Sequence, residues 1–75
     1  MTFDTSVYER HYGAKPDRKE EGAWLFEIAA TDGRGSYLTE LFQGWGTLAG
    51  AKADAVRDMK SVGRVTEIVS VVLLP

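Results

Sequence analysis

Cysteine is absent from this 75-residue chain, and histidine occurs only once, at His11. A chain without cysteine forms no disulfide, no Cys-ligated zinc site and no iron–sulfur cluster, and it offers no thiol nucleophile. The absence also fits a reducing compartment, so we expect a cytoplasmic protein. The serines lie in no motif typical of a nucleophile. We therefore expect a protein that is not an enzyme and that binds no metal or cofactor.

Long hydrophobic runs and a surplus of positive charge are also missing. The longest nearly apolar run covers residues 68–74, whereas a membrane-spanning helix needs about 20 residues. Residues 1–10 lack the pattern of a signal peptide. With 9 basic and 11 acidic residues, no general positive field attracts nucleic acid or a membrane surface. The hydrophobic content of 44% is typical of one small folded domain over residues 1–75.

The N-terminal segment and charged loop, residues 1–22, precede the expected core at residues 23–75. Asp4 is suited to begin a helix and Gly13 to end one, which predicts a short helix over residues 5–12. The alternation over residues 3–7 leaves a strand as the alternative. The following residues, 14–22, are charged and contain Pro16, which favours a loop.

Residues 23–31 and 36–43 predict a β-hairpin, because Asp32-Gly33 is a strong turn signal. A four-residue loop would place Glu27 opposite Glu40, which is unfavourable, so we expect a two-residue turn that pairs Glu27 with Leu38. Both registers give the same two faces. The face expected in the core carries Trp24, Phe26, Ile28, Tyr37, Leu41 and Trp45. The other face carries Leu25, Glu27, Leu38, Glu40 and Phe42.

Residues 47–62 predict an amphipathic helix that begins at Thr47 and is followed by Gly63. Residues 64–74 are rich in β-branched side chains and predict a final strand, with Val71 on one face and Ile68 on the other. A right-handed crossover makes this strand parallel to the second hairpin strand. The expected fold is a two-layer α+β domain of ββαβ topology, a three-stranded sheet of order 2-1-3 packed on one helix.

One helix covers only one face of such a sheet, which leaves an apolar face in need of a cover. A contiguous apolar patch on a small protein is typical of a partner surface. We therefore predict Leu25, Leu38 and Phe42 as contacts with a protein partner or with a second copy, and residues 37–43 as an edge open to strand addition. The alternative is that the N-terminal segment covers this face with Phe3, Val7 and Tyr12.

A basic cluster gives a second hypothesis, nucleic-acid binding. Cations interleaved with aromatic side chains can neutralise phosphates and stack on bases. The candidate cations are Arg10, Lys15, Arg18, Lys19 and Arg34, with Tyr8 and Tyr12 as stacking rings. Neighbouring acidic residues dilute this charge, so we favour a solvated loop.

The glycine-rich stretch at residues 44–50 gives a third, weaker hypothesis. It could hold an anion at residues 46–48, at the start of the expected helix. Its spacing matches no phosphate-binding motif. We therefore favour a flexible connection with Trp45 anchored in the core.

The segments YGAKP at residues 12–16 and GAWLF at residues 22–26 resemble a pattern in short phage-encoded proteins. The layout of residues 23–74, a hairpin led by Trp24, an alanine-rich helix and a β-branched strand, is similar to that of the small host RNA polymerase inhibitors of T7-like phages. The charged residues on which those inhibitors depend have no clear equivalents here. The resemblance implies a small, non-enzymatic protein that binds a larger macromolecule.

Overall fold

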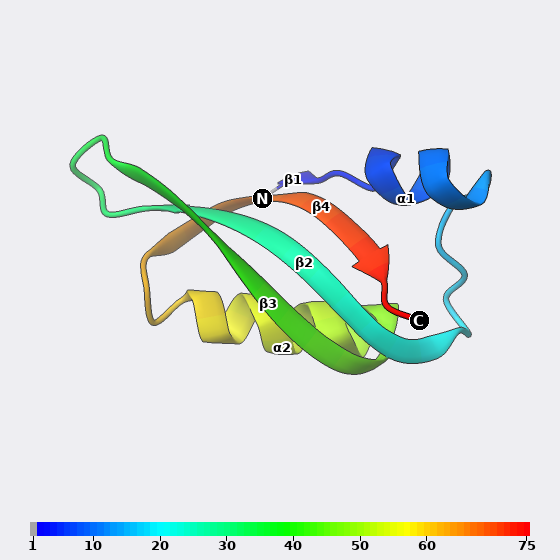
Figure 1. The fold of residues 1–75 in the computed structure, drawn as a ribbon. Coiled ribbons are helices and arrows are strands. Elements are labelled where there is room, and N and C mark those ends of the chain that lie inside the picture. Colours follow the sequence, from blue (N-terminus) through cyan, green and yellow to red (C-terminus); the bar gives the residue numbers. More distant parts are fainter. Residues whose placement is uncertain (1) are drawn as a thin grey trace.

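A four-stranded mixed sheet and two helices make up the fold (Figure 1). The computed structural model describes residues 2–75. The elements, in chain order, are β1 (Thr2–Phe3), α1 (Ser6–Tyr12), β2 (Glu21–Thr31), β3 (Tyr37–Thr47), α2 (Leu48–Met59) and β4 (Arg64–Leu73). The strand order is β1-β4-β2-β3. The expected α+β class is confirmed, and so is the predicted order of the hairpin and final strand, but the sheet has a fourth strand.

The fourth strand and the first helix both come from the N-terminal segment. β1 pairs in parallel with β4, with Phe3 opposite Ile68. The residue that precedes α1 is Thr5 and not the predicted Asp4, whose carboxylate instead accepts a hydrogen bond of 2.8 Å from the backbone N–H of Ser6 in the turn before the helix. Gly13 ends the helix with a positive φ of 75°, which glycine adopts without strain. The predicted helix is thus confirmed, and a short strand precedes it.

The hairpin register differs from the predicted one. β2 pairs with β3 so that Phe26 lies opposite Phe42 and Glu27 opposite Leu41, which leaves five residues, 32–36, between the strands. Neither the two-residue turn nor the four-residue loop is correct. The observed register differs from both by an odd number of residues, and an odd slip exchanges the faces of a strand. The predicted distribution of β3 side chains between the two faces is therefore wrong.

Asp32 and two glycines build the longer turn. The Asp32 carboxylate accepts hydrogen bonds from the backbone N–H groups of Arg34, at 2.7 Å, and of Ser36, at 3.4 Å. Gly33 and Gly35 both have positive φ, at 81° and 90°. The side chain of Asp32 thus closes a loop that backbone pairing alone would have made shorter.

β3 continues through the stretch that we predicted to be a flexible connection. Gly44 faces α2 at a distance that leaves no room for a side chain, since a Cβ there would lie 2.5 Å from the carbonyl oxygen of Ala51. Trp45 points to the opposite face and is 74% exposed, so its predicted place in the core is wrong. The indole of Trp24 instead occupies the core and donates a 2.9 Å hydrogen bond to the carbonyl oxygen of Gly46.

α2 packs on one face of the sheet (Figure 1), and its fully buried side chains are those of Ala51, Ala55 and Met59. The hydroxyl of Thr47 accepts a 3.3 Å hydrogen bond from the backbone N–H of Gly50, which confirms the predicted start of the helix. The helix ends at Met59, earlier than predicted, because the chain turns over residues 60–63. Gly63 lies against β2, where a Cβ would meet the carbonyl oxygen of Thr31 at 2.9 Å.

β4 has two irregularities in its pairing with β2, between Glu27 and Ile28 and between Ala29 and Ala30. A β-bulge changes which face the following residues occupy. Ile68 and Val71 are consequently both fully buried in the core, although simple alternation places them on opposite faces. The predicted faces of the final strand are therefore wrong on this point.

We predict opposite effects from the same substitution at two glycines. Gly44→Ala should lower the free energy of unfolding by about 1–3 kcal/mol, because the new Cβ meets helix backbone that has no room to move. Gly50→Ala, in the first turn of α2, should leave the stability unchanged or raise it by up to about 1 kcal/mol, because alanine favours helix. Urea unfolding of both variants measures the difference, and equal stabilities would contradict the close packing at Gly44.

Candidate functional site

The sheet face that points away from α2 is the main candidate surface, and we call it the open face. The register places on it every second residue of β2 and β3 together with part of β4. Its residues are Glu21, Ala23, Leu25, Glu27, Ala29 and Thr31 of β2, Tyr37, Thr39, Leu41, Gln43, Trp45 and Thr47 of β3, and Arg64, Glu67, Ser70 and Val72 of β4. The face therefore combines an apolar part along β3 with three carboxylates on β2 and β4 and one guanidinium group at the end of β4.

Three large apolar side chains on β3 are mostly exposed on this face. Tyr37 is 75% exposed, Leu41 62% and Trp45 74%. They recur every four residues, so they form a single row along the strand. Single exposed apolar residues are common, but a row of three on one strand is typical of a contact surface.

The structure separates the three residues predicted as partner contacts. Leu25 lies on the open face and is half-buried. Leu38 and Phe42 lie on the opposite face, because they pair with Ala30 and Phe26. Phe42 packs against the core, and Leu38 is 46% exposed near the hairpin turn. The three residues therefore do not form one surface.

The exposed row on β3 takes the place of that predicted set. The sequence groups Tyr37, Leu41 and Trp45 on one face of the hairpin, but the predicted register turns that face to the core. The shifted register moves the whole row to the open face.

The N-terminal segment packs against the core on the α2 side. The ring of Phe3 lies 6.5 Å from that of Phe26, and the ring of Tyr8 lies 5.8 Å from that of Trp24. The ammonium group of Lys52, on α2, lies 4.8 Å from the centre of the Phe3 ring. The alternative that this segment covers the sheet face that points away from the helix is therefore wrong.

Tyr8 is the most buried residue of the N-terminal segment, at 5% exposure. Burial raises the pKa of its phenol above the ordinary value of 10.0, and the negative charge of Glu20 adds to the effect. At the other end of the same segment, hydrogen bonds from Ser6 lower the pKa of Asp4.

Of the five cations of the nucleic-acid hypothesis, four lie on α1 or in the loop after it, and one lies apart from them. Arg10 lies on α1, and Arg34 lies in the hairpin turn at the opposite end of the molecule (Figure 1). The remaining three, Lys15, Arg18 and Lys19, lie in the loop that follows α1. Tyr8 is too buried to stack on a base. Tyr12 is 46% exposed and donates a 3.0 Å hydrogen bond from its hydroxyl to the carbonyl oxygen of Leu73.

The start of α2 is the place predicted for an anion. One of its backbone N–H groups already has a hydrogen-bond partner. The Thr47 hydroxyl accepts from the backbone N–H of Gly50, one of the groups that would have bound the anion. The preceding Gly46 is the end of a strand and accepts the hydrogen bond from Trp24. This helix start therefore gives no support for anion binding.

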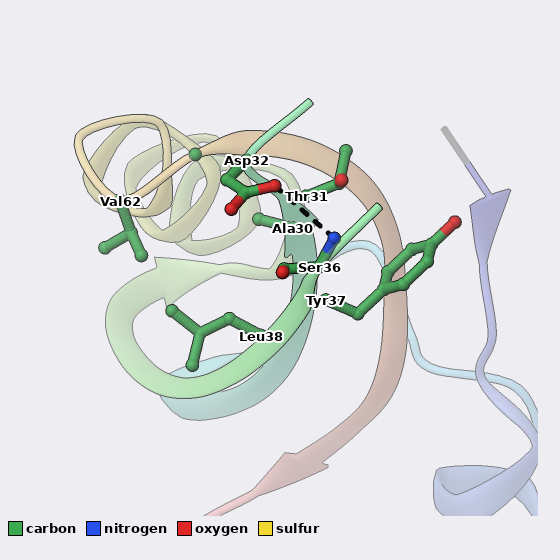
Figure 2. Close-up of a pocket in the computed structure, with 8 residues that line it drawn as sticks. Ala30, Thr31, Asp32, Ser36, Tyr37, Leu38 and Val62 are labelled. Carbon is green, nitrogen blue, oxygen red and sulfur yellow. Dashed lines mark hydrogen bonds between the residues drawn. The ribbon is translucent and has the colours of Figure 1, made fainter. Parts of the chain in front are cut away.

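A pocket of about 140 Å³ lies between the hairpin turn and the chain after α2 (Figure 2). Its volume is below the roughly 300 Å³ at which sites for small molecules begin. The one carboxylate in it belongs to Asp32 and accepts hydrogen bonds within the turn. The lining residues are Ala30, Thr31, Asp32, Ser36, Tyr37, Leu38, Val62 and Gly63. The pocket is thus part of the turn structure.

The described part of the chain offers neither a metal site nor a membrane-spanning helix. Within residues 2–75, His, Asp and Glu side chains form no group of three or more that could hold a metal ion. Neither α1 nor α2 is long and apolar enough to cross a membrane. No protein family, curated protein or solved structure was found to match this chain.

We predict that the two tryptophans differ sharply in their access to solvent. Acrylamide should quench the fluorescence of Trp45, which is 74% exposed, and should barely affect that of Trp24, which is fully buried. Trp45→Phe should therefore remove most of the quenchable emission, and Trp24→Phe should leave it. Protection of Trp45 from acrylamide in a dilute sample would contradict the observed hairpin register.

We predict a loss of stability at alkaline pH that depends on Tyr8. Because the folded-state pKa is raised, the folded phenol keeps its proton when the unfolded one releases it. The contribution of this phenol to the free energy of unfolding is complete below pH 10, and it is lost as the pH rises through the folded-state pKa. Urea unfolding from pH 8 to 11 should show a smaller loss for Tyr8→Phe than for the unchanged chain. Tyr37→Phe, at an exposed ring, is the control, and parallel profiles for all three proteins would contradict the prediction.

Proposed function

We propose that this chain is a small, non-enzymatic binding module that acts through protein–protein contact at the open face of its sheet. The observation that carries the proposal is the exposed row of Tyr37, Leu41 and Trp45 on β3. Aromatic side chains of this kind are enriched at protein interfaces, where they bury a large area at a small entropic cost.

The surroundings of the row support a protein partner. Leu25 and Val72 are half-buried beside it, so the apolar surface continues from β3 across β2 to β4. The charged side chains nearest the middle of the face are those of Glu27, opposite Leu41, and Glu67, opposite Ala29, and both are negative. A surface with apolar side chains and carboxylates suits a protein partner better than a phosphate backbone, which requires cations.

The proposal includes a cytoplasmic location, in keeping with the absence of cysteine. The similarity of layout to phage inhibitors of a host polymerase supports extending it to a phage- or prophage-encoded protein whose partner is a host protein. A second copy of the chain is the other partner that fits, because the row lies on an edge strand.

A pull-down with a matched pair of variants tests the proposal. Leu41→Lys places a positive charge in the middle of the row, opposite Glu27, so the fold should tolerate it while the apolar contact is lost. Ala53→Lys places the same charge on the exposed side of α2. A partner should bind the unchanged chain and Ala53→Lys, and binding to Leu41→Lys should fall about tenfold or more.

The bound partner is then purified, and its affinity for the three proteins is measured by calorimetry. Purified, untagged chain is included among the candidate partners, and circular dichroism checks that both variants fold. The proposal fails if every protein retained by the chain binds Leu41→Lys as tightly as it binds Ala53→Lys.

A further inference from the structure

The outer edge of β3 is an eleven-residue strand with no partner strand among residues 2–75. Natural proteins protect such edges with proline, lysine or inward-pointing charges. β3 contains neither proline nor lysine, and its single charged residue, Glu40, is exposed. α2 packs on one face of the sheet and comes close to β3 at Gly44 (Figure 1). The edge is therefore open to strand addition.

The hydrogen bonds within the sheet show which groups of β3 point outward. The backbone N–H of Asp32 donates to the carbonyl oxygen of Ser36, at 3.3 Å, so this pair is a hydrogen-bonded one. Hydrogen-bonded and non-hydrogen-bonded pairs alternate along an antiparallel ladder. Even-numbered residues of β3 therefore bond to β2, and odd-numbered residues direct their N–H and C=O groups to the free edge.

The other edge of β2 agrees with this assignment. There the backbone N–H of Leu74 donates a 2.7 Å hydrogen bond to the carbonyl oxygen of Ala23, an odd-numbered residue. The odd residues of β2 thus bond to β4 and its even residues to β3, as the alternation requires.

This arrangement restricts how a second β3 can pair with the first. Outward groups must meet outward groups, so odd residues must lie opposite odd residues in an antiparallel pair. The two open faces then lie on the same side of a joined sheet. A symmetric pair also requires the surface to be complementary to itself.

One register satisfies both conditions with apolar pairs along the whole row. With the two-fold axis at Leu41, the two copies of Leu41 meet, and each Tyr37 lies opposite the other copy's Trp45. Thr39 then lies opposite Gln43. Such aromatic cross-strand pairs are among the more stabilising ones. About ten backbone hydrogen bonds would form.

Neighbouring registers are less favourable. An axis at Glu40 places two carboxylates directly opposite each other, which is destabilising. An axis at Phe42 places Leu41 opposite Gln43 and Trp45 opposite Thr39, so the row loses all its apolar pairs. The spacing of Tyr37, Leu41 and Trp45 is symmetric about Leu41 only.

We propose that two copies of this chain associate by antiparallel pairing of their β3 strands, with the two-fold axis at Leu41, to form a continuous eight-stranded sheet. This inference rests on the proposed function, for which it names the partner. The joined sheet brings both rows of Tyr37, Leu41 and Trp45 to its centre.

Cysteine substitution tests the register directly, because the chain has no cysteine of its own. In the proposed pair the Cα atoms of the two Leu41 residues are about 5.5 Å apart, within the range of a disulfide. Leu41→Cys should therefore give a disulfide-linked dimer under mild oxidation. Thr39→Cys should not, because the two copies of residue 39 lie about 13 Å apart along the strands.

A mixture provides the positive control for the same register. Thr39→Cys and Gln43→Cys should each remain largely unlinked alone, but should form a mixed disulfide when combined. Equal cross-linking of Leu41→Cys and Thr39→Cys, or no mixed product, would overturn the register.

A proline substitution separates edge pairing from packing between open faces. The backbone N–H of Thr39 points outward, so Thr39→Pro should remove no hydrogen bond within the chain, whereas it blocks strand addition. Sedimentation equilibrium from low micromolar to near-millimolar concentration should show a dimer for the unchanged chain and for Thr39→Ala, and a monomer for Thr39→Pro. A dimer that survives Thr39→Pro would refute edge pairing.

The two proposals fail in different ways. A chain that stays monomeric throughout the concentration range overturns this inference. The proposed function still stands in that case if a different purified protein binds the unchanged chain and does not bind Leu41→Lys. If no protein, including a second copy, depends on Leu41, both proposals fail together.

Discussion

The pairing of β2 with β3 determines what the surface of this protein offers. A slip of one residue would exchange the faces of β3, moving Phe42 and Gly44 away from α2 and turning Trp45 toward it. The Asp32 carboxylate fixes the pairing at the turn. Gly44 fixes it again near the far end, because only a residue without a Cβ lets the backbone of Ala51 come so close. Two independent constraints thus hold the same register.

Most of the fold could be predicted from the sequence, because most of its helices and strands are indicated by the residues within them. The hairpin, α2 and β4 each have their own periodicity, and Thr47 and Gly13 mark helix ends through hydrogen bonds that involve only neighbouring residues. β1 could not be predicted as a fourth strand in the sheet. Its two residues are strand only because β4 lies beside them, and so distant a contact leaves no local pattern.

The candidate site was harder to predict, because it depends on a turn length. Asp32-Gly33 favours a two-residue turn, and the positive φ at Gly35 that lengthens it has no signal in hydropathy. A two-residue turn and a four-residue loop both place Trp45 on the core face, so neither of the turns that hydropathy suggests leads to the observed surface. The bulges in β4 are also not predicted by hydropathy, since simple alternation places Ile68 and Val71 on opposite faces and the bulges bring both into the core.

The N-terminal segment covers part of the sheet edge that lies opposite β3. β1 occupies the outer edge of β4 beside Glu67 and Ile68, and the hydroxyl of Tyr12 holds α1 to Leu73 at the end of the same strand. β1 and α1 thus take up part of the outer edge of β4, and the eleven-residue edge of β3 is the longer of the two edges that remain for strand addition among residues 2–75. Residues 2–12 therefore make the two margins of the sheet unequal, since a two-residue margin strand is a poor template for sheet growth.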